Sequence, residues 1–258
     1  MKKYKIKKFQ NKKNKTKLVC LTSYSKNVTK LIDDFCDLIL VGDSMANVLY
    51  GMKNTHELKL TTVINHAISV KKGISKSLLV VDMPKNSYTN IIQAKKNAKL
   101  ILKKTKCDAV KIENNSKNLK VVKALVKSGI NVMGHIGYTP QFKNKFKVEG
   151  KTSKEQKKLI NEAKQIEKAG AFSIVLECIS KNTSLKITQQ IKIPTIGIGS
   201  SSFCDGQILV TDDILGLSGF YPKFVKKYSN LESLIRKSVK MYSKDVKSKK
   251  FPKNKNSY

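Results

Sequence analysis

The sequence predicts an α/β fold, a (β/α)8 TIM barrel in a single domain, from three observations. Short apolar segments alternate with longer amphipathic segments, which is typical of parallel strands joined by helices. Seven such strands can be identified in the 258 residues, with an eighth near 207–215, which matches the size of an eight-unit barrel. Several predicted strands end in charged or polar residues, at the position where barrel enzymes carry their active sites.

The predicted strands are short runs rich in Val, Ile and Leu. Strands of a parallel barrel are buried on both faces, so near-continuous apolar runs are expected. In chain order they cover residues 18–23, 38–44, 78–84, 109–114, 131–137, 173–179 and 194–200.

Amphipathic segments between these strands predict helices over residues 62–73, 90–106, 119–129 and 154–170. Three of the four end in glycine, a usual helix stop. A doubly wound open sheet is the alternative fold, but no GxGxxG pattern follows the first strand. Residues from about 218 onward are expected to form helices that close the barrel, followed by a lysine-rich tail.

Residues 1–17 form a basic N-terminal segment with nine lysines and no acidic residue, and residues 18–258 are expected to form the catalytic barrel domain. The basic segment lacks the apolar region of a signal peptide. No apolar run in the chain is long enough to cross a bilayer. We therefore expect a cytoplasmic protein with no membrane partner and a loosely ordered N-terminus.

The net charge of +34 raises the question of a nucleic-acid partner. The excess is almost entirely lysine spread along the chain, with Arg236 as the sole arginine, and no nucleic-acid-binding motif is present. A solvated basic surface is therefore expected, and nucleic acid is not an expected partner. The five cysteines are odd in number and form no CxxC pair, which predicts reduced, buried thiols.

Charged and polar residues stand at the ends of five predicted strands. They are Asp43 and Ser44, Asp82, Lys111 and Glu113, His135, and Glu177. In a parallel barrel these strand ends lie at one face. Residues two apart on a strand point the same way, so Lys111 and Glu113 should both face the barrel mouth while Val110 and Ile112 pack outward.

Three of these carboxylates, Asp43, Asp82 and Glu113, would repel one another unless protons or a cation lie between them. Lys111 supplies one positive charge. A Mg²⁺ ion held by oxygen ligands is the fuller explanation. With only three histidines in the chain, a nitrogen-rich metal site is not expected. Glu177 is then a further carboxylate that can act as a base beside the metal. His56 and His66 receive no role.

Several motifs resemble the ketopantoate hydroxymethyltransferase family. They are LVGDSMANVLYG, VVDMP, AVKIEN, VMGHIGYTPQ, GAFSIVLECI and IPTIGIGS followed by CDGQILV, in the order found in that family. The resemblance extends from about residue 18 to Phe251 and Pro252. It implies a (β/α)8 barrel that binds Mg²⁺ and assembles into a large homo-oligomer, commonly a decamer.

The resemblance also implies an activity: transfer of a one-carbon unit from 5,10-methylenetetrahydrofolate to the keto acid 3-methyl-2-oxobutanoate, giving 2-dehydropantoate for pantothenate and coenzyme A biosynthesis. Asp43 and Asp82 match the direct metal ligands, and Glu113 matches the third acidic residue of the metal site. Ser44 and Lys111 match the residues that hold the substrate carboxylate. Glu177 matches the general base, and His135 is expected to support the substrate region.

The chain departs from the family pattern mostly where the family has small residues. The departures are Ser25, Ala46, Lys85, Asn114, Asn115, Ser200 and Ser201. Loss of glycine at such positions would strain turns that need positive φ. Two alternatives remain: another Mg²⁺-dependent barrel enzyme that cleaves a carbon–carbon bond in a keto acid, and a basic nucleic-acid-binding protein on a decayed barrel.

Overall fold

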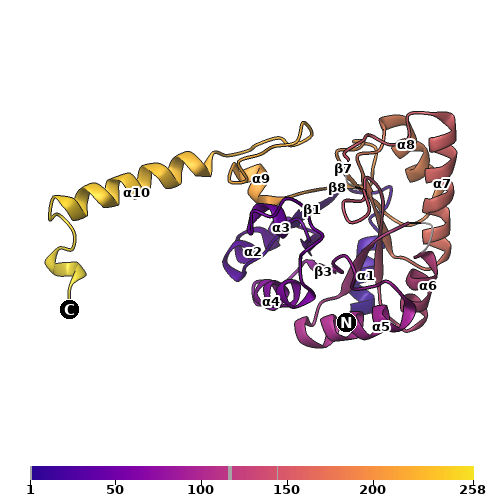
Figure 1. The fold of residues 1–258 in the computed structure, drawn as a ribbon, viewed down its shortest axis with the longest axis horizontal. Helices are drawn as coiled ribbons and strands as arrows, with labels where there is room; N and C mark the ends of the chain where they lie inside the picture. The colour runs from indigo at the N-terminus through magenta and orange to yellow at the C-terminus, as the bar shows by residue number, and fades with distance from the viewer. Residues whose placement is uncertain (1, 116–117, 144) are drawn as a thin grey trace. The chain divides into compact units, whose positions relative to one another are not determined.

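A computed structural model describes residues 2–115, 118–143 and 145–258, and it shows a closed barrel of eight parallel strands in chain order (Figure 1). The predicted fold class is thereby confirmed. The strands are β1 (Leu18–Thr22), β2 (Leu38–Val41), β3 (Leu78–Asp82), β4 (Ala109–Glu113), β5 (Val132–Gly137), β6 (Ser173–Glu177), β7 (Thr195–Ile198) and β8 (Gly206–Leu209).

One helix precedes the first strand, and most of the others lie between successive strands. They are α1 (Lys2–Gln10), α2 (Lys26–Ile32), η1 (Asp33–Phe35), α3 (Met45–Val48), α4 (Leu60–Lys71), α5 (Ile91–Thr105), α6 (Leu119–Lys127), α7 (Ser153–Lys168), α8 (Lys181–Gln190), α9 (Thr211–Leu215), α10 (Leu231–Lys247) and η2 (Asn254–Asn256). The predicted eighth strand was too long, because residues 211–215 form α9, with Asp212 and Asp213 in its first turn. Acidic residues there favour a helix start.

Side chains of the strands alternate between two apolar layers. In β4, Ala109 belongs to the cluster inside the barrel, whereas Val110 and Ile112 belong to the cluster between strands and helices. Lys111 and Glu113 therefore share the inward direction of Ala109, and both are buried, as the period of two predicts.

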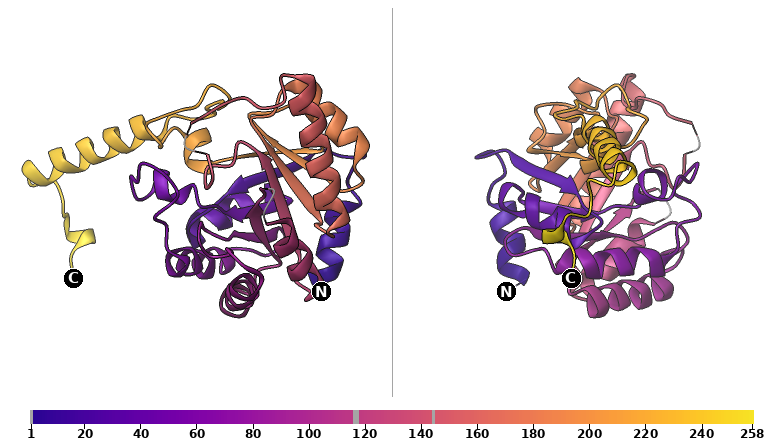
Figure 2. Two further views of the ribbon diagram at one scale, coloured as in Figure 1. Left: turned by 45° about the vertical axis from the view of Figure 1, so that its right-hand side comes forward. Right: turned by 90° about the vertical axis from the view of Figure 1, so that its left-hand side faces the viewer.

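Helix α1 covers the N-terminal ends of the strands (Figure 2). Ile6 and Phe9 are buried in the inner cluster, and the Phe9 ring packs edge-to-face on Phe172 at 5.9 Å between centroids. Lys13 Nζ lies 2.7 Å from the carboxylate of Asp205, which precedes β8. The expectation of a loosely ordered N-terminus was wrong for this helix, because two apolar residues among its lysines reach the barrel interior.

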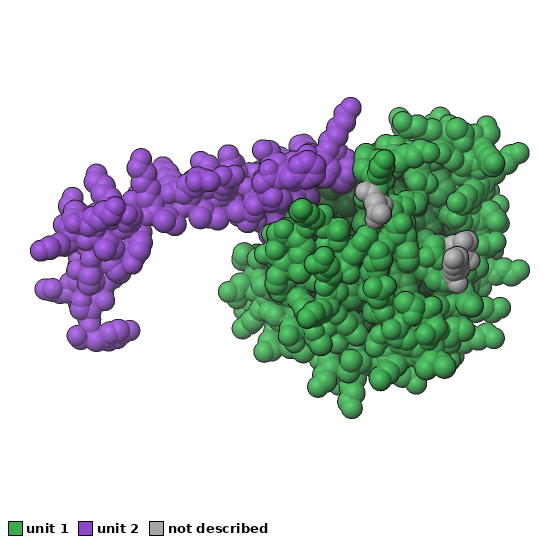
Figure 3. Space-filling model, in the orientation of Figure 1, with its two compact units in different colours: residues 1–210 green, residues 211–258 purple. Residues whose placement is uncertain are grey.

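Residues 211–258 form a second compact unit, which is coloured separately in Figure 3. Its main element is α10, which begins at the N-cap Asn230 and has no buried residue. Apolar side chains spaced at three and four residues lie exposed along this helix: Ile235, Val239, Tyr242 and Val246. Such a stripe is the pattern of a helix that packs against a partner.

All five cysteines are free and buried, which confirms the prediction of reduced thiols in the interior. None of the helices in the described part of the chain is long and apolar enough to span a membrane.

Asp33 connects η1 to the turn before β3. Its carboxylate accepts four hydrogen bonds: from the Ser75 N–H (2.8 Å), the Ser75 hydroxyl (2.7 Å), the Lys76 N–H (2.8 Å) and the Ser77 N–H (3.0 Å). Burial raises the pKa of Asp33, but these hydrogen bonds outweigh it and hold the pKa well below its usual range. The ionised carboxylate thus stabilises the fold.

We predict that Asp33→Asn lowers the free energy of unfolding at pH 7 by about 1–3 kcal/mol, because the amide turns an N–H₂ group toward buried donors. The folded-state pKa is depressed, so the contribution of Asp33 is complete above its unfolded pKa of about 4 and declines as pH falls from there toward the folded-state pKa. Urea denaturation at pH 7 and at pH 3 measures both effects. The matched control is Asp34→Asn, whose side chain is 62% exposed. Equal midpoints for the two variants would contradict the prediction.

Candidate active site

The structure brings the charged strand ends together at the C-terminal end of the barrel. Asp82, Glu113 and Glu177 are the last residues of β3, β4 and β6. Strand β2 ends at Val41, earlier than predicted. Asp43 and Ser44 therefore lie after the strand, in the turn before α3. Lys111 and His135 lie within β4 and β5.

A buried ion pair joins two of these strands. Lys111 Nζ donates to Asp82 Oδ1 at 2.7 Å, and the side chains are 6% and 1% exposed. Burial raises the pKa of Asp82 to about 7; Lys111 opposes this shift and Asp43 adds to it. Burial also disfavours the charged lysine, but Asp82, Asp43 and Glu113 together raise the pKa of Lys111 above its usual value. Lys111 is therefore charged.

Glu113 and Asp43 add two more carboxylates to this cluster. Both are buried, and the Asp43 N–H donates to Asp82 Oδ2 at 3.1 Å. Burial raises the pKa of Glu113 well above its usual value, and the charge of Asp43 raises it further. The cluster thus holds more carboxyl groups than one lysine can neutralise, so protons or an added cation must offset their repulsion.

His135 lies between two glutamates. Its Nε2 is 3.1 Å from Glu177 Oε2 and its Nδ1 is 3.7 Å from Glu113 Oε1, but neither nitrogen has a partner at hydrogen-bonding angles among the described residues. Burial, and then Lys111, lower the pKa of His135 well below its usual value, so the imidazole is neutral. Burial raises the pKa of Glu177 to about 7, and Lys111 partly offsets this rise. The Glu177 side chain is 18% exposed, so it remains accessible.

Gln141 is a buried residue of the site that sequence reasoning missed. Its Nε2 donates to Asp43 Oδ2 at 2.8 Å, and its backbone N–H donates to Glu113 Oε2 at 2.9 Å. The Tyr88 hydroxyl donates to Gln141 Oε1 at 2.6 Å, which sets the amide orientation. The only sequence signal was an amide after Thr139-Pro140 at a strand end, and a turn gives no indication of which carboxylates it meets.

Ser44 and the two remaining histidines lie near the same end of the barrel. The hydroxyls of Ser44 and Tyr24 are 2.9 Å apart, and His66 Nδ1 lies 2.7 Å from the Tyr24 carbonyl oxygen. His56 Nε2 lies 2.9 Å from the carbonyl oxygen of Pro140. These two histidines, to which the sequence assigned no role, thus contact segments that carry site residues.

The backbone around Glu177 is tightly constrained. The Tyr138 N–H donates to the Glu177 carbonyl oxygen at 2.8 Å. A Cβ on Gly137, which has a φ of 96°, would lie 2.1 Å from that same oxygen, so a side chain is excluded there. Cys178 adopts a φ of 51°, which is uncommon for a residue other than glycine and marks local strain beside Glu177.

The departures from the family pattern cause no strain of the expected kind. Asn114, Asn115, Ser200 and Ser201 are all described by the structure, and none is among its residues with positive φ. Asn114 Oδ1 instead accepts a hydrogen bond from the His135 N–H at 3.1 Å. The expectation that lost glycines strain these turns was therefore wrong.

The residues present fit a hard divalent cation. Asp43, Asp82 and Glu113 offer buried oxygen donors, and their mutual repulsion is relieved by positive charge. No group of three His, Cys, Asp or Glu side chains within the described ranges is arranged to hold a metal ion. Mg²⁺ commonly takes one or two carboxylates and completes its shell with water and substrate, so a closed cage of protein ligands is not required.

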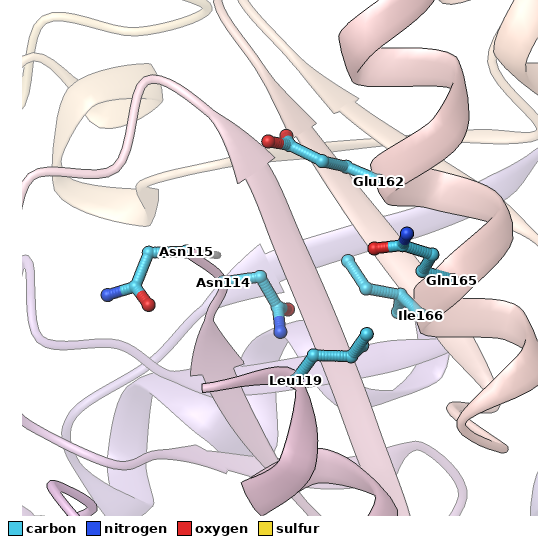
Figure 4. A pocket seen from close by; sticks show the side chains of 6 residues that line it. All are labelled: Asn114, Asn115, Leu119, Glu162, Gln165 and Ile166. Carbon is cyan, nitrogen blue, oxygen red and sulfur yellow. The ribbon is translucent and has the colours of Figure 1, made fainter. Parts of the chain in front are cut away.

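A small pocket lies next to this cluster, and none of the residues predicted for the active site lines it (Figure 4). It is lined by Asn114 and Asn115 after β4, Leu119 of α6, and Glu162, Gln165 and Ile166 of α7. The charged strand ends therefore form a site separate from this pocket.

Solved structures with the same fold include phosphonopyruvate hydrolase in complex with oxalate and Mg²⁺, with a TM-score of 0.64, 11% identity and coverage of 98% of this chain and 93% of that chain. Another is 2,3-dimethylmalate lyase, with a TM-score of 0.62, 12% identity and coverage of 98% and 92%. At such low identity these likenesses support the fold alone.

Relatives found by sequence are far more similar to this chain than these solved structures are. The 3-methyl-2-oxobutanoate hydroxymethyltransferase of Pelagibacter ubique (strain HTCC1062) is 50% identical over 254 residues, covering 98% of this chain and 99% of the relative. The enzyme of that name from Anaplasma marginale (strain Florida) is 46% identical over 252 residues, covering 96% and 91%. The family model for ketopantoate hydroxymethyltransferase matches residues 3–254. With these matches over nearly its whole length, the chain belongs to the ketopantoate hydroxymethyltransferase family.

Proposed function

We propose that this hydroxymethyltransferase moves a one-carbon unit from 5,10-methylenetetrahydrofolate to 3-methyl-2-oxobutanoate, giving 2-dehydropantoate for pantothenate and coenzyme A biosynthesis. Family membership supports the substrate and the reaction class. The observation that carries the mechanism is the accessible carboxylate of Glu177, with a pKa raised to about 7, beside a cluster that holds a buried, charged lysine. A base with a pKa near the working pH is well suited to remove a weakly acidic proton.

In this proposal the keto acid binds at the cluster through its carboxylate and keto oxygen. The charge of Lys111 and the hydroxyl of Ser44 hold the substrate carboxylate. Asp43 and Asp82 would hold Mg²⁺ next to the substrate, and Glu113 would be the third acidic residue of the metal site. A bound Mg²⁺ supplies Lewis acidity that makes the C3 proton easier to remove.

The proton at C3 passes to a carboxylate oxygen of Glu177. The electron pair left on C3 forms a bond to the methylene carbon of the folate, and water supplies the hydroxyl oxygen on that carbon. Both carbon–nitrogen bonds of the methylene carbon break, and the two folate nitrogens take up the proton held by Glu177 and the proton left from water, which gives tetrahydrofolate. Neutral His135, 3.1 Å from Glu177, contacts the base without neutralising it. Holding base and both reactants around one carbon lowers the entropic barrier.

We also propose a homo-oligomer in the cytoplasm, with no nucleic-acid or membrane partner. The exposed apolar side chains along α10 support self-assembly, because a solvent-exposed stripe of this kind is typical of interaction surfaces.

Proton exchange at C3 tests the proposed base. In D₂O with Mg²⁺ and without folate, the wild-type protein should exchange the C3 proton of 3-methyl-2-oxobutanoate, followed by NMR. Glu177→Gln should lower the rate by about 10²–10⁴-fold, the usual contribution of a positioned base. The matched control is Glu162→Gln, a partly buried glutamate of α7 whose side chain is 27% exposed. Exchange by Glu177→Gln at the wild-type rate would rule out its role, and product analysis with folate separates a transferase from a carbon–carbon lyase.

The same exchange should depend on pH through Glu177. A carboxyl group acts as a base only when ionised, and the folded-state pKa is about 7. The rate should therefore rise about tenfold per unit below the midpoint and level off above about pH 7. Positive charge from Mg²⁺ moves the midpoint downward. A rate that falls with increasing pH between 5 and 8 would contradict this assignment.

Mg²⁺ should stabilise the folded protein, because it relieves the repulsion among the buried carboxylates. At a free concentration of ten times Kd the expected gain is about 1.4 kcal/mol. The gain should be larger at pH 8 than at pH 5.5, since Asp82 with a folded pKa of about 7 binds a proton in competition with the ion. Thermal denaturation with Mg²⁺ or EDTA measures this. Asp82→Asn should weaken the response while Asp34→Asn should keep it, and equal responses in all three proteins would reject the proposed ligand.

A further inference from the structure

The loop after β5 combines aromatic and basic residues in an unusual order. Its sequence from residue 141 is QFKNKFKVEGK, in which phenylalanines and lysines alternate closely. We define the aromatic–lysine loop as residues 138–143 and 145–151, all of which the structure describes. Within it Gln141 contacts the acidic cluster, and the exposed aromatic and basic residues have no part in the proposed proton transfer.

Exposed aromatic rings distinguish this loop from ordinary solvated surface. Phe146 is 61% exposed and packs edge-to-face on Tyr138, at 5.5 Å between ring centroids. Phe142 is 42% exposed and packs in the same manner on Tyr88 at 6.4 Å. Large apolar rings that remain exposed beside a polar site are a usual feature of ligand surfaces.

The loop is attached to the strand ends that carry the base. The Tyr138 N–H donates to the carbonyl oxygen of Glu177 at 2.8 Å, and the Glu149 N–H donates to that of Cys178 at 2.9 Å. Lys143 Nζ donates to the Gly137 carbonyl oxygen at 2.7 Å and pairs with Glu149 at 2.8 Å. After burial, the charges of Glu177 and Glu113 raise the pKa of Tyr138, in agreement with a phenol near the acidic cluster.

The charge of the loop is strongly positive. It carries Lys143, Lys145, Lys147 and Lys151 against one acidic residue, Glu149. Lys143 and Lys147 are engaged in ion pairs with Glu149 and Glu155, and the Lys147 side chain is still 62% exposed. Lys145 is exposed next to Phe146 in the sequence. A flat ring system with an anionic tail complements this surface in both shape and charge.

We infer that the aromatic–lysine loop binds the folate co-substrate, with its ring system on Phe146 and Tyr138 and its glutamate carboxylates near Lys145 and Lys147. This inference rests on the proposed function, which requires a folate donor. Stacking of planar heterocycles on aromatic side chains is favourable and does not need hydrogen bonds from the ring edge. Since Tyr138 adjoins Glu177 through the backbone, a folate held there lies beside the carbon that loses its proton.

The first test compares binding of tetrahydrofolate, a donor analogue without the transferable carbon, by isothermal titration calorimetry. Phe146→Ala should raise Kd about tenfold, the usual effect of removing a stacking ring. Phe146→Tyr should restore binding. The control is Phe35→Ala, because Phe35 is 77% exposed at the other end of the barrel, before β2. In all of these variants the folate-free C3 proton exchange should stay at the wild-type rate, which also shows that they are folded.

The second test addresses the glutamate tail. The wild-type protein should bind tetrahydrofolate triglutamate more tightly than the monoglutamate, and Lys145→Gln should reduce that preference several-fold at low salt. Lys96→Gln removes the same charge from an exposed position on α5 and should leave the preference unchanged.

The outcomes separate this inference from the proposed function. If the wild-type protein binds tetrahydrofolate and Phe146→Ala binds it equally well, the loop is not the folate site while the transferase proposal stands. If the wild-type protein exchanges the C3 proton but does not bind tetrahydrofolate, the folate donor and the loop assignment both fail. Equal losses in Phe146→Ala and Phe35→Ala would show a general effect of surface aromatics and would overturn the inference.

Discussion

The site depends on the burial of four carboxylates around a single lysine. Asp43, Asp82 and Glu113 lie almost wholly inside the protein, Glu177 lies at the edge, and Lys111 faces them from β4. Water would separate such charges, whereas the barrel interior strengthens both their attraction to Lys111 and their mutual repulsion. This imbalance explains the raised pKa of Glu113 and Asp82, and it prepares the site for an added cation.

Supporting residues turn this cluster into a defined geometry. Gln141 holds Asp43 with its side chain and Glu113 with its backbone, so one residue sets the position of two carboxylates. The close approach of Gly137 and the left-handed Cys178 fix the segment of Glu177 from both sides. Preorganisation of this kind spares the reaction the cost of reorienting charged groups.

Local patterns predicted the barrel and the inward direction of Lys111 and Glu113, because strand alternation is a property of neighbouring residues. They also placed Asp82 and Glu177 at strand ends, whereas His135, predicted at a strand end, lies within β5. The role of Gln141 and the buried face of α1 were not predictable in this way. Both depend on contacts with residues far away in the chain, such as Asp43 for Gln141 and Phe172 for Phe9.

The N-terminal helix has a consequence for the order in which the molecule can fold. Lys13 pairs with Asp205, 192 positions later, and Phe9 packs on Phe172. Helix α1 is therefore made before Phe172 and Asp205, and its packing cannot be complete until both have been synthesised. Contacts of such long range slow folding. During that interval Ile6 and Phe9 remain in water, so a newly made chain exposes apolar side chains until the barrel closes.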